Sequence, residues 1–482
     1  MSKNFYITTT LPYVNAPAHM GHALEFVRAD IIARHKKLLG FEVFFNTGTD
    51  EHGQKILQKA LENNQTPQEF VDLYANKFKD LLKLLGISSD INFIRTTDPN
   101  HIKSVQDFWK LCDKNGYIYK KNYQIKYCVG CELEKTDSDL VDGKCPDHPN
   151  LVLEIRGEEN YFFRFSSFQK PLLDLYAKNP SFVIPETRLK EIKNFVEAGL
   201  SDFSISRLRE KMSWGIEVPG DTLHVMYVWF DALVNYISAI GWPTDMEKFN
   251  KWQMETGGMV QYCGKDNLRQ QSAMWQAMLM AAGLPNSKQI IIDGFVTGAL
   301  GIKMSKTLGN VIDPLDLLKE YSTDALRYYV SRELSSFDDS PMTVEMFKEA
   351  YNANLANGLG NLVSRVMKMA ETNLNEPISL SSQKAVLSSD FNDFLDKFEI
   401  QKATDLIWQK IAEADKMIQE MQPFKLVKSD KEKGVEIIKD LVVKVFIISC
   451  LLEPIMPETS KKIKDLIKNN KSPETPLFLR KD

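Results

Sequence analysis

The sequence lacks any long uninterrupted apolar run. The longest apolar stretch, residues 441–452, is interrupted by Lys444 and is too short to span a bilayer. We therefore expect a buried helix there and no membrane segment. The amino terminus has neither the charged region nor the apolar core of a signal peptide, and no internal repeat or low-complexity tract is present.

Neither sign of charge dominates the chain. Sixty Lys and Arg residues stand against 64 Asp and Glu residues, giving a formal net charge of −4. A histone-like polycation is therefore excluded, although a large acidic protein can still carry a local basic face that binds nucleic acid. The hydrophobic fraction of 43% excludes a disordered or collagen-like chain, and 482 residues suggest about three domains.

Cysteine is scarce and unevenly placed. Of the six cysteines, Cys128, Cys131 and Cys145 fall within 18 residues, which argues against an evenly cross-linked secreted scaffold. We expect a reducing, cytoplasmic compartment. The other three, Cys112, Cys263 and Cys450, are expected to be buried core residues.

Strand and helix patterns alternate from the start of the chain. Residues 5–11 and 41–45 are rich in aromatic and β-branched residues and predict strands. Residues 19–39 have helical apolar spacing, and a second helix is expected to begin near Glu51. Thr66-Pro67-Gln68-Glu69 predicts a capped helix start. This order predicts a parallel α/β sheet.

The α/β rhythm is interrupted and then gives way to helices. Short β-like runs replace it between about 117 and 219, and it is expected to resume with a strand at 223–229, a helix at 272–282 and a strand at 289–292. Residues 342–471 have almost wholly helical spacing, with the charged run 425–433 expected as a loop. The predicted domains are a split Rossmann-like α/β domain (1–116 and 223–297), an inserted module (117–222), a connecting fold (298–350) and an α-helical bundle (351–482).

A first candidate site is His19-Met20-Gly21-His22 at a predicted helix start. Two histidines three apart lie on one face, where the helix dipole and unpaired N–H groups favour phosphate. Gly21 leaves room for a ligand against the backbone. A helix start that happens to contain histidine is about as plausible on this evidence alone, and a metal pair is less so because no third ligand is near in sequence.

A second candidate is the loop 301–310. Lys303 and Lys306, with small and hydroxyl residues between glycines, can place ammonium groups on a polyphosphate. Alone, such a loop is more often a solvated basic segment. Together the two motifs are more specific, since they fall on the two halves of the split domain.

A third candidate has the spacing of a metal site. Cys128-x2-Cys131-x13-Cys145-x2-His148 provides two pairs of ligands, each able to form a tight knuckle around zinc. Four protein ligands leave no open position, so the zinc would be structural. Reduced free thiols are the less favoured alternative.

These motifs resemble those of the class I aminoacyl-tRNA synthetases. His19-Met20-Gly21-His22 matches the HIGH motif with Met for Ile, and Lys303-Met304-Ser305-Lys306-Thr307 matches KMSKS with Thr for the last Ser. Further matches, at 11–15, 47–53, 205–207, 228–232 and 357–365, resemble the methionyl-tRNA synthetases. The resemblance runs from about Phe5 to Lys464, and that family often has a zinc knuckle in its inserted module.

The resemblance implies roles for single residues. ATP would be bound by His19, Gly21, His22, Lys303, Ser305 and Lys306, with His19, His22, Lys303 and Lys306 catalytic. Methionine would be bound by Leu11, Tyr13, Asp50, Trp229, Ala232, Leu233, Tyr236 and Gln271. Without the resemblance, Asp50 could equally be a helix N-cap, and Trp229 and Tyr236 core residues. Gln271 departs from the family, which often has His there.

In the helical region the resemblance implies anticodon binding. Asn357, Asn361 and Arg365 are spaced four apart and are expected to share a helix face. Phe424, which follows Pro423, stands where the family usually has a stacking Trp. A solvated polar helix face is the alternative reading of this row.

Taken as a whole, the resemblance implies a ligase. ATP and Mg²⁺ would convert methionine to methionyl-adenylate and pyrophosphate, and the methionyl group would pass to the 3′ end of a methionine-accepting tRNA, initiator or elongator. One structural zinc per chain is expected. A monomer is expected because the chain ends soon after the bundle. The rivals are a class I synthetase for another amino acid, disfavoured by the short insertion, and a non-catalytic zinc-containing RNA-binding protein.

Overall fold

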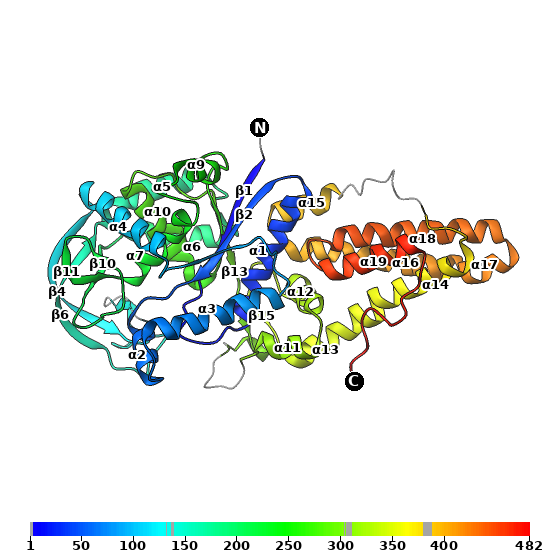
Figure 1. Cartoon of the computed structure of the whole chain (residues 1–482), viewed down its shortest axis with the longest axis horizontal. Helices are drawn as coiled ribbons and strands as arrows, with labels where there is room; N and C mark the ends of the chain where they lie inside the picture. Colours follow the sequence, from blue (N-terminus) through cyan, green and yellow to red (C-terminus); the bar gives the residue numbers. More distant parts are fainter. Residues whose placement is uncertain (1–2, 132, 136–138, 303, 305–310, 379–387) are drawn as a thin grey trace. The chain divides into compact units, whose positions relative to one another are not determined.

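The computed structural model describes residues 3–482 except 132, 136–138, 303, 305–310 and 379–387. The chain forms two compact units. The first comprises residues 1–17, 42–80 and 90–292, and the second comprises residues 18–41, 81–89 and 293–482. Figure 1 labels the elements and colours them along the sequence.

The first unit is built on a six-stranded sheet. Its strand order is β3-β2-β1-β12-β13-β7. Strand β1 pairs in parallel with β2 and β12, β2 with β3, and β13 with β7. The predicted Rossmann-like parallel sheet is therefore confirmed. The strands are β1 (Asn4–Thr9), β2 (Glu42–Thr49), β3 (Asn92–Arg95), β7 (Val183–Ile184), β12 (Val260–Gly264) and β13 (Gln289–Asp293).

Strand β1 lies inside the sheet, and all six of its residues are buried. Aromatic and β-branched side chains such as Tyr6 and Ile7 suit a strand covered on both faces. The strand ends at Thr9, before the predicted end at Leu11. Residues 10–13 are thereby left to turn at the carboxyl edge of the sheet, where open α/β sheets bind ligands.

Helices of the first unit begin close to their predicted positions. The capping box at Thr66 is confirmed, because the Thr66 N–H donates to Glu69 Oε2 (2.9 Å) and the Glu69 N–H donates to Thr66 Oγ1 (3.2 Å). The helix expected near Glu51 begins later, at Gln54. The helices are α2 (Gln54–Glu62), α3 (Pro67–Leu84), α4 (Pro99–Lys114), α5 (Gln169–Lys178), α6 (Glu186–Glu197), α7 (Val228–Ala232), α8 (Asn235–Ser238), α9 (Met246–Phe249) and α10 (Trp275–Ala281), with the π-helical turns η3 (Asn250–Met254) and η5 (Gln270–Met274).

The expected interruption of the α/β pattern is built from antiparallel sheets. One has the order β5-β4-β6-β8 and the other β10-β11-β9. Their strands are β4 (Ile118–Cys128), β5 (Leu133–Lys135), β6 (Glu154–Phe163), β8 (Phe203–Ser204), β9 (Ser206–Leu208), β10 (Glu217–Val218) and β11 (Asp221–Met226). The long antiparallel pair of β4 and β6 runs from Ile118 opposite Phe163 to Tyr127 opposite Glu154.

The prediction that residues 223–229 return the chain to the parallel sheet is wrong. Strand β11 pairs antiparallel with β9 and β10, and Trp229 lies in α7. The chain returns through β12, and the two-residue β7, from within the interrupted region, pairs with β13. Apolar periodicity marks a strand but does not specify its partner, and β7 is too short to give a periodic signal.

The second unit is mainly helical, as predicted for residues 342–471. Its helices are α1 (Met20–Leu38), α11 (Pro314–Glu320), α12 (Thr323–Arg332), α13 (Val344–Ala350), the π-helical segment η8 (Tyr351–Gly360), α14 (Asn361–Asn373), α15 (Ser389–Asp396), α16 (Ile400–Met421), α17 (Pro423–Ser429), α18 (Lys431–Leu452) and α19 (Pro457–Asn469). The short strands β14 (Val296–Thr297) and β15 (Ser340–Pro341) pair in parallel. Helix α18 packs against α16 and α19 (Figure 1).

The charged run 425–433 is not the expected loop. Helix α17 covers Pro423–Ser429, and α18 begins at Lys431 after Asp430, whose side chain accepts from the Lys433 N–H (3.1 Å). Charged residues suit an exposed helix face as well as a loop, and Asp430 acts as an N-cap. The apolar stretch 441–452 is the buried end of α18, as expected. Among the described residues, no helix combines the length and apolarity needed to cross a membrane.

Helix α1 is held within the second unit by buried ion pairs. Arg28 Nη1 contacts Asp293 Oδ1 at 2.8 Å, and Arg327 Nη2 contacts Asp30 Oδ2 at 2.8 Å. Arg28 also donates to the carbonyls of Val330, within α12, and of Leu334 and Ser335, just after α12. Each of these buried charges has a partner of opposite sign. The ion pairs therefore fix the orientation of α1, including its first turn, within the second unit.

Candidate active site

Tyr13 and Asp50 lie side by side where β1 and β2 end. The Asp50 N–H donates to the Pro12 carbonyl (2.9 Å) and the Val14 N–H donates to the Asp50 carbonyl (3.2 Å), forming a parallel bridge between Tyr13 and Asp50. Helix α2 has Gly53 as its N-cap residue, so Asp50 is not the N-cap that the sequence allowed. Leu11, Tyr13 and Asp50 are each half-buried, as groups facing a ligand should be.

A buried carboxylate next to Asp50 fixes this turn. Glu51 is fully buried and accepts from Arg95 Nε (2.7 Å) and Nη2 (2.9 Å) and from Thr97 Oγ1 (2.5 Å). The Glu51 N–H donates to Thr96 Oγ1 (2.9 Å). The residue after Asp50 is thereby held on both its backbone and its side chain. No local sequence pattern indicates the Arg95 partner, which is 44 residues away.

The predicted methionine-binding residues of the 228–236 segment lie on α7, on α8 and, for Leu233, at the C-cap of α7. Trp229 and Ala232 are half-buried, and Leu233 and Tyr236 are buried. The Tyr6 hydroxyl donates to the Tyr236 carbonyl (2.7 Å), which ties α8 to β1. Gln271 Nε2 donates to the Tyr236 hydroxyl (2.8 Å), so the structure brings these two residues together.

Two histidines that no sequence argument assigned hold α7 in place. Asp231 Oδ2 contacts His52 Nδ1 at 2.6 Å, and Asp231 Oδ1 contacts His101 Nε2 at 2.9 Å. Burial alone raises the pKa of Asp231, but the opposing interactions with His52 and His101 are stronger and hold that pKa below its usual value. Asp231 therefore stays ionised between the segments that carry Asp50 and Trp229. His52 lies within the matched segment 47–53, whereas no sequence pattern indicates His101.

His19 and His22 form the first turn of α1 in the second unit. Their rings stack with centroids 3.9 Å apart. Nδ1 of His19 accepts from the Gly21 N–H (3.1 Å), and Nδ1 of His22 accepts from the His19 N–H (3.2 Å). In a neutral imidazole the other nitrogen then carries the hydrogen, so each ring presents Nε2–H as a donor. A Cβ on Gly21 would lie 3.0 Å from the His19 ring, so glycine permits this stacking.

The environment of His22 favours its neutral form. Burial, followed by the neighbouring His19, lowers the pKa of His22 well below its usual value. The imidazole is therefore a neutral donor at physiological pH. Lys303, Ser305, Lys306 and Thr307 of the second phosphate motif lie outside the described residues.

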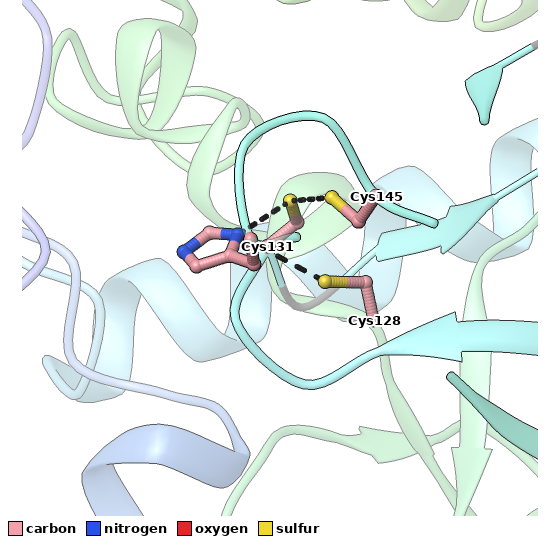
Figure 2. A group of neighbouring side chains, drawn as sticks. Cys128, Cys131 and Cys145 are labelled. Carbon is pink, nitrogen blue, oxygen red and sulfur yellow. Dashed lines mark hydrogen bonds between the residues drawn. The ribbon is translucent and has the colours of Figure 1, made fainter. Parts of the chain in front are cut away.

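The four predicted metal ligands gather at one point. One ligand atom from each of Cys128, Cys131, Cys145 and His148 lies within 4.8 Å of the others. Cys131 Sγ is 3.3 Å from Cys145 Sγ and 3.2 Å from His148 Nδ1. Figure 2 shows how the labelled thiol groups of Cys128, Cys131 and Cys145 gather in one place. Three thiolates and one imidazole suit tetrahedral Zn²⁺.

The backbone around this cluster is adapted to it. A Cβ on Gly130 would lie 2.3 Å from the His148 ring, so only glycine allows the ring to approach. Lys55, from α2, donates to the Gly130 carbonyl. The remaining three cysteines, Cys112, Cys263 and Cys450, are buried, as predicted.

The predicted anticodon residues occupy two kinds of helix. Asn357 lies in the π-helical segment η8, whereas Asn361 and Arg365 lie one turn apart in α14. The α-helical spacing on which the expected common face depends therefore applies to Asn361 and Arg365 and does not extend to Asn357. Arg365 Nη1 contacts Asp415 Oδ1 on α16 at 3.1 Å. Asn357, Asn361 and Phe424 are exposed, with Phe424 at 44%.

Similarity to known proteins agrees with this arrangement. The family model described as tRNA synthetases class I (M) matches residues 5–150 and 149–367. A methionine–tRNA ligase of Caldanaerobacter subterraneus is 40% identical over 478 residues, covering 96% of this chain and 74% of the relative. One from Thermotoga maritima is 39% identical, covering 95% of this chain and 74% of the relative.

Solved structures give the same family. Methionyl-tRNA synthetase of Mycobacterium tuberculosis in complex with methionyl-adenylate is 33% identical, with a TM-score of 0.91, and the match covers 99% of this chain and 100% of that one. The ligand-free form of that enzyme matches with a TM-score of 0.84 at 31% identity, covering 100% of this chain and 99% of that one. The chain therefore belongs to the methionine–tRNA ligase family of the class I tRNA synthetases.

Proposed function

We propose that this ligase activates methionine with ATP to methionyl-adenylate and pyrophosphate, and then transfers the methionyl group to the 3′-terminal ribose of a methionine-accepting tRNA. The observation that carries the proposal is the stacked imidazole pair at the start of α1, whose Nδ1 atoms both accept backbone hydrogens. In the neutral rings that pattern places the hydrogen on Nε2, beside the positive end of a helix dipole.

The activation step needs positioning and charge stabilisation and no protein nucleophile. The methionine carboxylate attacks the α-phosphorus, and negative charge moves toward the leaving pyrophosphate. The Nε2–H groups of His19 and His22 would hydrogen-bond to phosphate oxygens, with Gly21 allowing close approach. Lys303 and Lys306 would place ammonium groups on the leaving phosphates, with Ser305 a further contact. Mg²⁺, held by the phosphates, would neutralise part of their charge.

The methionine side of the site is proposed in the first unit. Asp50 would pair with the substrate ammonium, and its backbone is already fixed by the bridge to Tyr13. Leu11, Tyr13, Trp229, Ala232 and Leu233 would contact the side chain, since aromatic and aliphatic walls suit a flexible thioether. The Tyr236 hydroxyl, which accepts a hydrogen bond from Gln271, would hydrogen-bond to the sulfur.

The cysteine cluster can bind one zinc ion per chain, and we propose a structural role for it. Cys128, Cys131, Cys145 and His148 would fill all four positions, which leaves none for substrate. Zinc would hold the two knuckles together and contribute no step of the reaction.

The tRNA partner would be recognised in the helical region. Asn357, Asn361 and Arg365 can hydrogen-bond to base edges, and Phe424 can stack on a base. Elongator and initiator tRNAs both qualify. We further propose a cytoplasmic location, a monomeric state, and the domain limits 1–116, 117–222, 223–297, 298–350 and 351–482.

The overall reaction can be tested with purified protein, methionine, ATP and transcripts of a methionine tRNA. Methionyl-tRNA and AMP should form in equal amounts and only with the intact CAU anticodon. A class I synthetase for another amino acid would charge a different tRNA. A non-catalytic RNA-binding protein would retain the tRNA without releasing AMP.

A further inference from the structure

A chain of buried amides and hydroxyls runs from β12 to Tyr236 in the first unit. Its members are Gln261 on β12, Gln271 and Gln276, Ser287 in the turn before β13, and the Tyr236 hydroxyl. Each of these residues is at most 6% exposed. Buried polar groups in such a chain are held in one arrangement by their mutual hydrogen bonds.

Two backbone groups determine the direction in which hydrogen bonds are donated at one end of this series. The Ser287 N–H, which can only donate, donates to Gln276 Oε1 (3.0 Å). The Gln271 carbonyl, which can only accept, accepts from Gln276 Nε2 (2.8 Å). The orientation of the Gln276 amide therefore follows from its partners, although amide oxygen and nitrogen are otherwise hard to distinguish.

The direction then passes from one residue to the next. Gln276 Nε2 also donates to Ser287 Oγ (2.9 Å), and the Ser287 hydroxyl donates its own hydrogen to Gln261 Oε1 (2.5 Å). Gln261 Nε2 donates to Gln271 Oε1 (2.5 Å), and Gln271 Nε2 donates to the Tyr236 hydroxyl (2.8 Å). The phenol oxygen thus receives a hydrogen from the protein, and its own O–H is the group with which it donates.

We infer that Gln261, Gln276 and Ser287, acting through Gln271, are positioning residues that set Tyr236 as a hydrogen-bond donor to the substrate sulfur and so make the site specific for a thioether. This inference rests on the proposed function. A thioether sulfur accepts a weak hydrogen bond, whereas the methylene that replaces it in norleucine cannot. A phenol turned the other way would offer the sulfur only lone pairs. Selectivity between these isosteres therefore depends on the direction of the chain.

Ser287→Ala and Gln261→Glu test this direction. Ser287→Ala removes the relay hydroxyl. Gln261→Glu keeps the shape but replaces the amide donor by an acceptor, so Gln271 must turn its own Nε2 toward it and present Oε1 to Tyr236. The ratio of kcat/KM for methionine to that for norleucine, measured by pyrophosphate exchange, should fall about two- to tenfold in either variant.

The same two substitutions made in Tyr236→Phe separate direction from simple damage. Without the hydroxyl, Ser287→Ala and Gln261→Glu should leave the ratio unchanged, since they act only through it. Gln253→Met is the matched control. Gln253 is buried and donates to the carbonyls of Pro285 and Asn286, next to Ser287. It makes none of the hydrogen bonds that connect Gln276 to Tyr236. It should lower the melting temperature and leave the ratio at the wild-type value.

Several results would overturn the inference. One is an unchanged ratio in Ser287→Ala and Gln261→Glu proteins that melt cooperatively. Another is an equal fall in the Tyr236→Phe background, which would indicate a packing effect. Absence of methionine-dependent exchange in the wild type would contradict the proposed function itself, whereas exchange with an insensitive ratio would contradict only this inference.

Discussion

The residues proposed to bind methionine and those proposed to bind the anticodon differ in burial and in how many hydrogen bonds hold their side chains in place. Tyr236 and Gln271 are 1% and 2% exposed, and each has its polar side-chain atoms tied to named partners. Asn357 and Asn361 are exposed, and the Arg365 side chain is 37% exposed, with one ion pair to Asp415. Methionine would therefore contact side chains that are already held in place before it binds. The side chains that contact the tRNA would become ordered only when the tRNA binds. Preorganisation lowers the ordering cost of binding, so substitutions in the two regions should have different consequences.

The largest expected effect concerns the histidines proposed to bind the phosphates of ATP. His22→Ala removes an Nε2–H donor, so the rate of methionyl-adenylate formation should fall roughly 10²–10³-fold, while the affinity for methionine alone changes little. His22→Gln, which keeps an N–H donor at similar reach, should recover part of the loss. Single-turnover adenylate formation and equilibrium dialysis with methionine provide the two measurements. A loss of methionine affinity without a slower chemical step would show that the histidines are misassigned.

A second large effect is expected at the cysteine cluster. Cys145→Ser should weaken zinc binding by more than the roughly 10–100-fold that loss of an outer partner causes, because it removes a direct ligand. Metal analysis of purified protein should give one zinc per chain for the wild type and far less for the variant. Cys112→Ser, at a buried thiol outside the cluster, is the control and should keep its zinc. Full zinc content in Cys145→Ser would exclude this ligand set.

Arg365→Ala should have an intermediate effect, confined to reactions with tRNA. Loss of one base contact costs about 1–3 kcal/mol, so kcat/KM for charging should fall roughly 10–100-fold. Methionine-dependent pyrophosphate exchange without tRNA should stay within about twofold of wild type. Asp415→Asn removes the ion-pair partner but keeps the guanidinium, so it should preserve charging. If Arg365→Ala and Asp415→Asn lose charging equally, the ion pair rather than base contact is what matters.

The smallest expected effect is on the pH dependence of stability. Burial, only partly offset by Arg28, raises the pKa of Asp293 to about 6. Between the unfolded value of about 3.9 and that folded value, the folded state binds more protons than the unfolded state. The free energy of unfolding contributed by Asp293 is therefore present at low pH and lost as pH rises toward 6. Asp293→Asn should remove a slope on the order of 1 kcal/mol per pH unit from the free energy of unfolding in this window, measured by urea unfolding. Parallel curves for the two proteins would contradict it.

Local sequence patterns predicted much of the fold and the grouping of the metal ligands. The alternation of strands and helices, the Thr66 cap and the cysteine cluster each depend on residues close in sequence. The pairing of β12 with β1 and of β7 with β13 was not predicted, because strand partners are chosen by tertiary packing. His101, Arg95 and Gln261 were missed for the same reason, since they act on residues between 10 and 130 positions away. The helix over 423–429 was missed because charge alone does not distinguish an exposed helix from a loop.

Amino-acid-dependent exchange of pyrophosphate into ATP tests the central claim most directly. The assay needs no tRNA and can be run with each of the standard amino acids in turn. We expect exchange with methionine, at least about a hundredfold above any other amino acid of similar size, because the site combines apolar walls with a donor for sulfur. Exchange that depends on a different amino acid, or no exchange with any of them, would contradict the account.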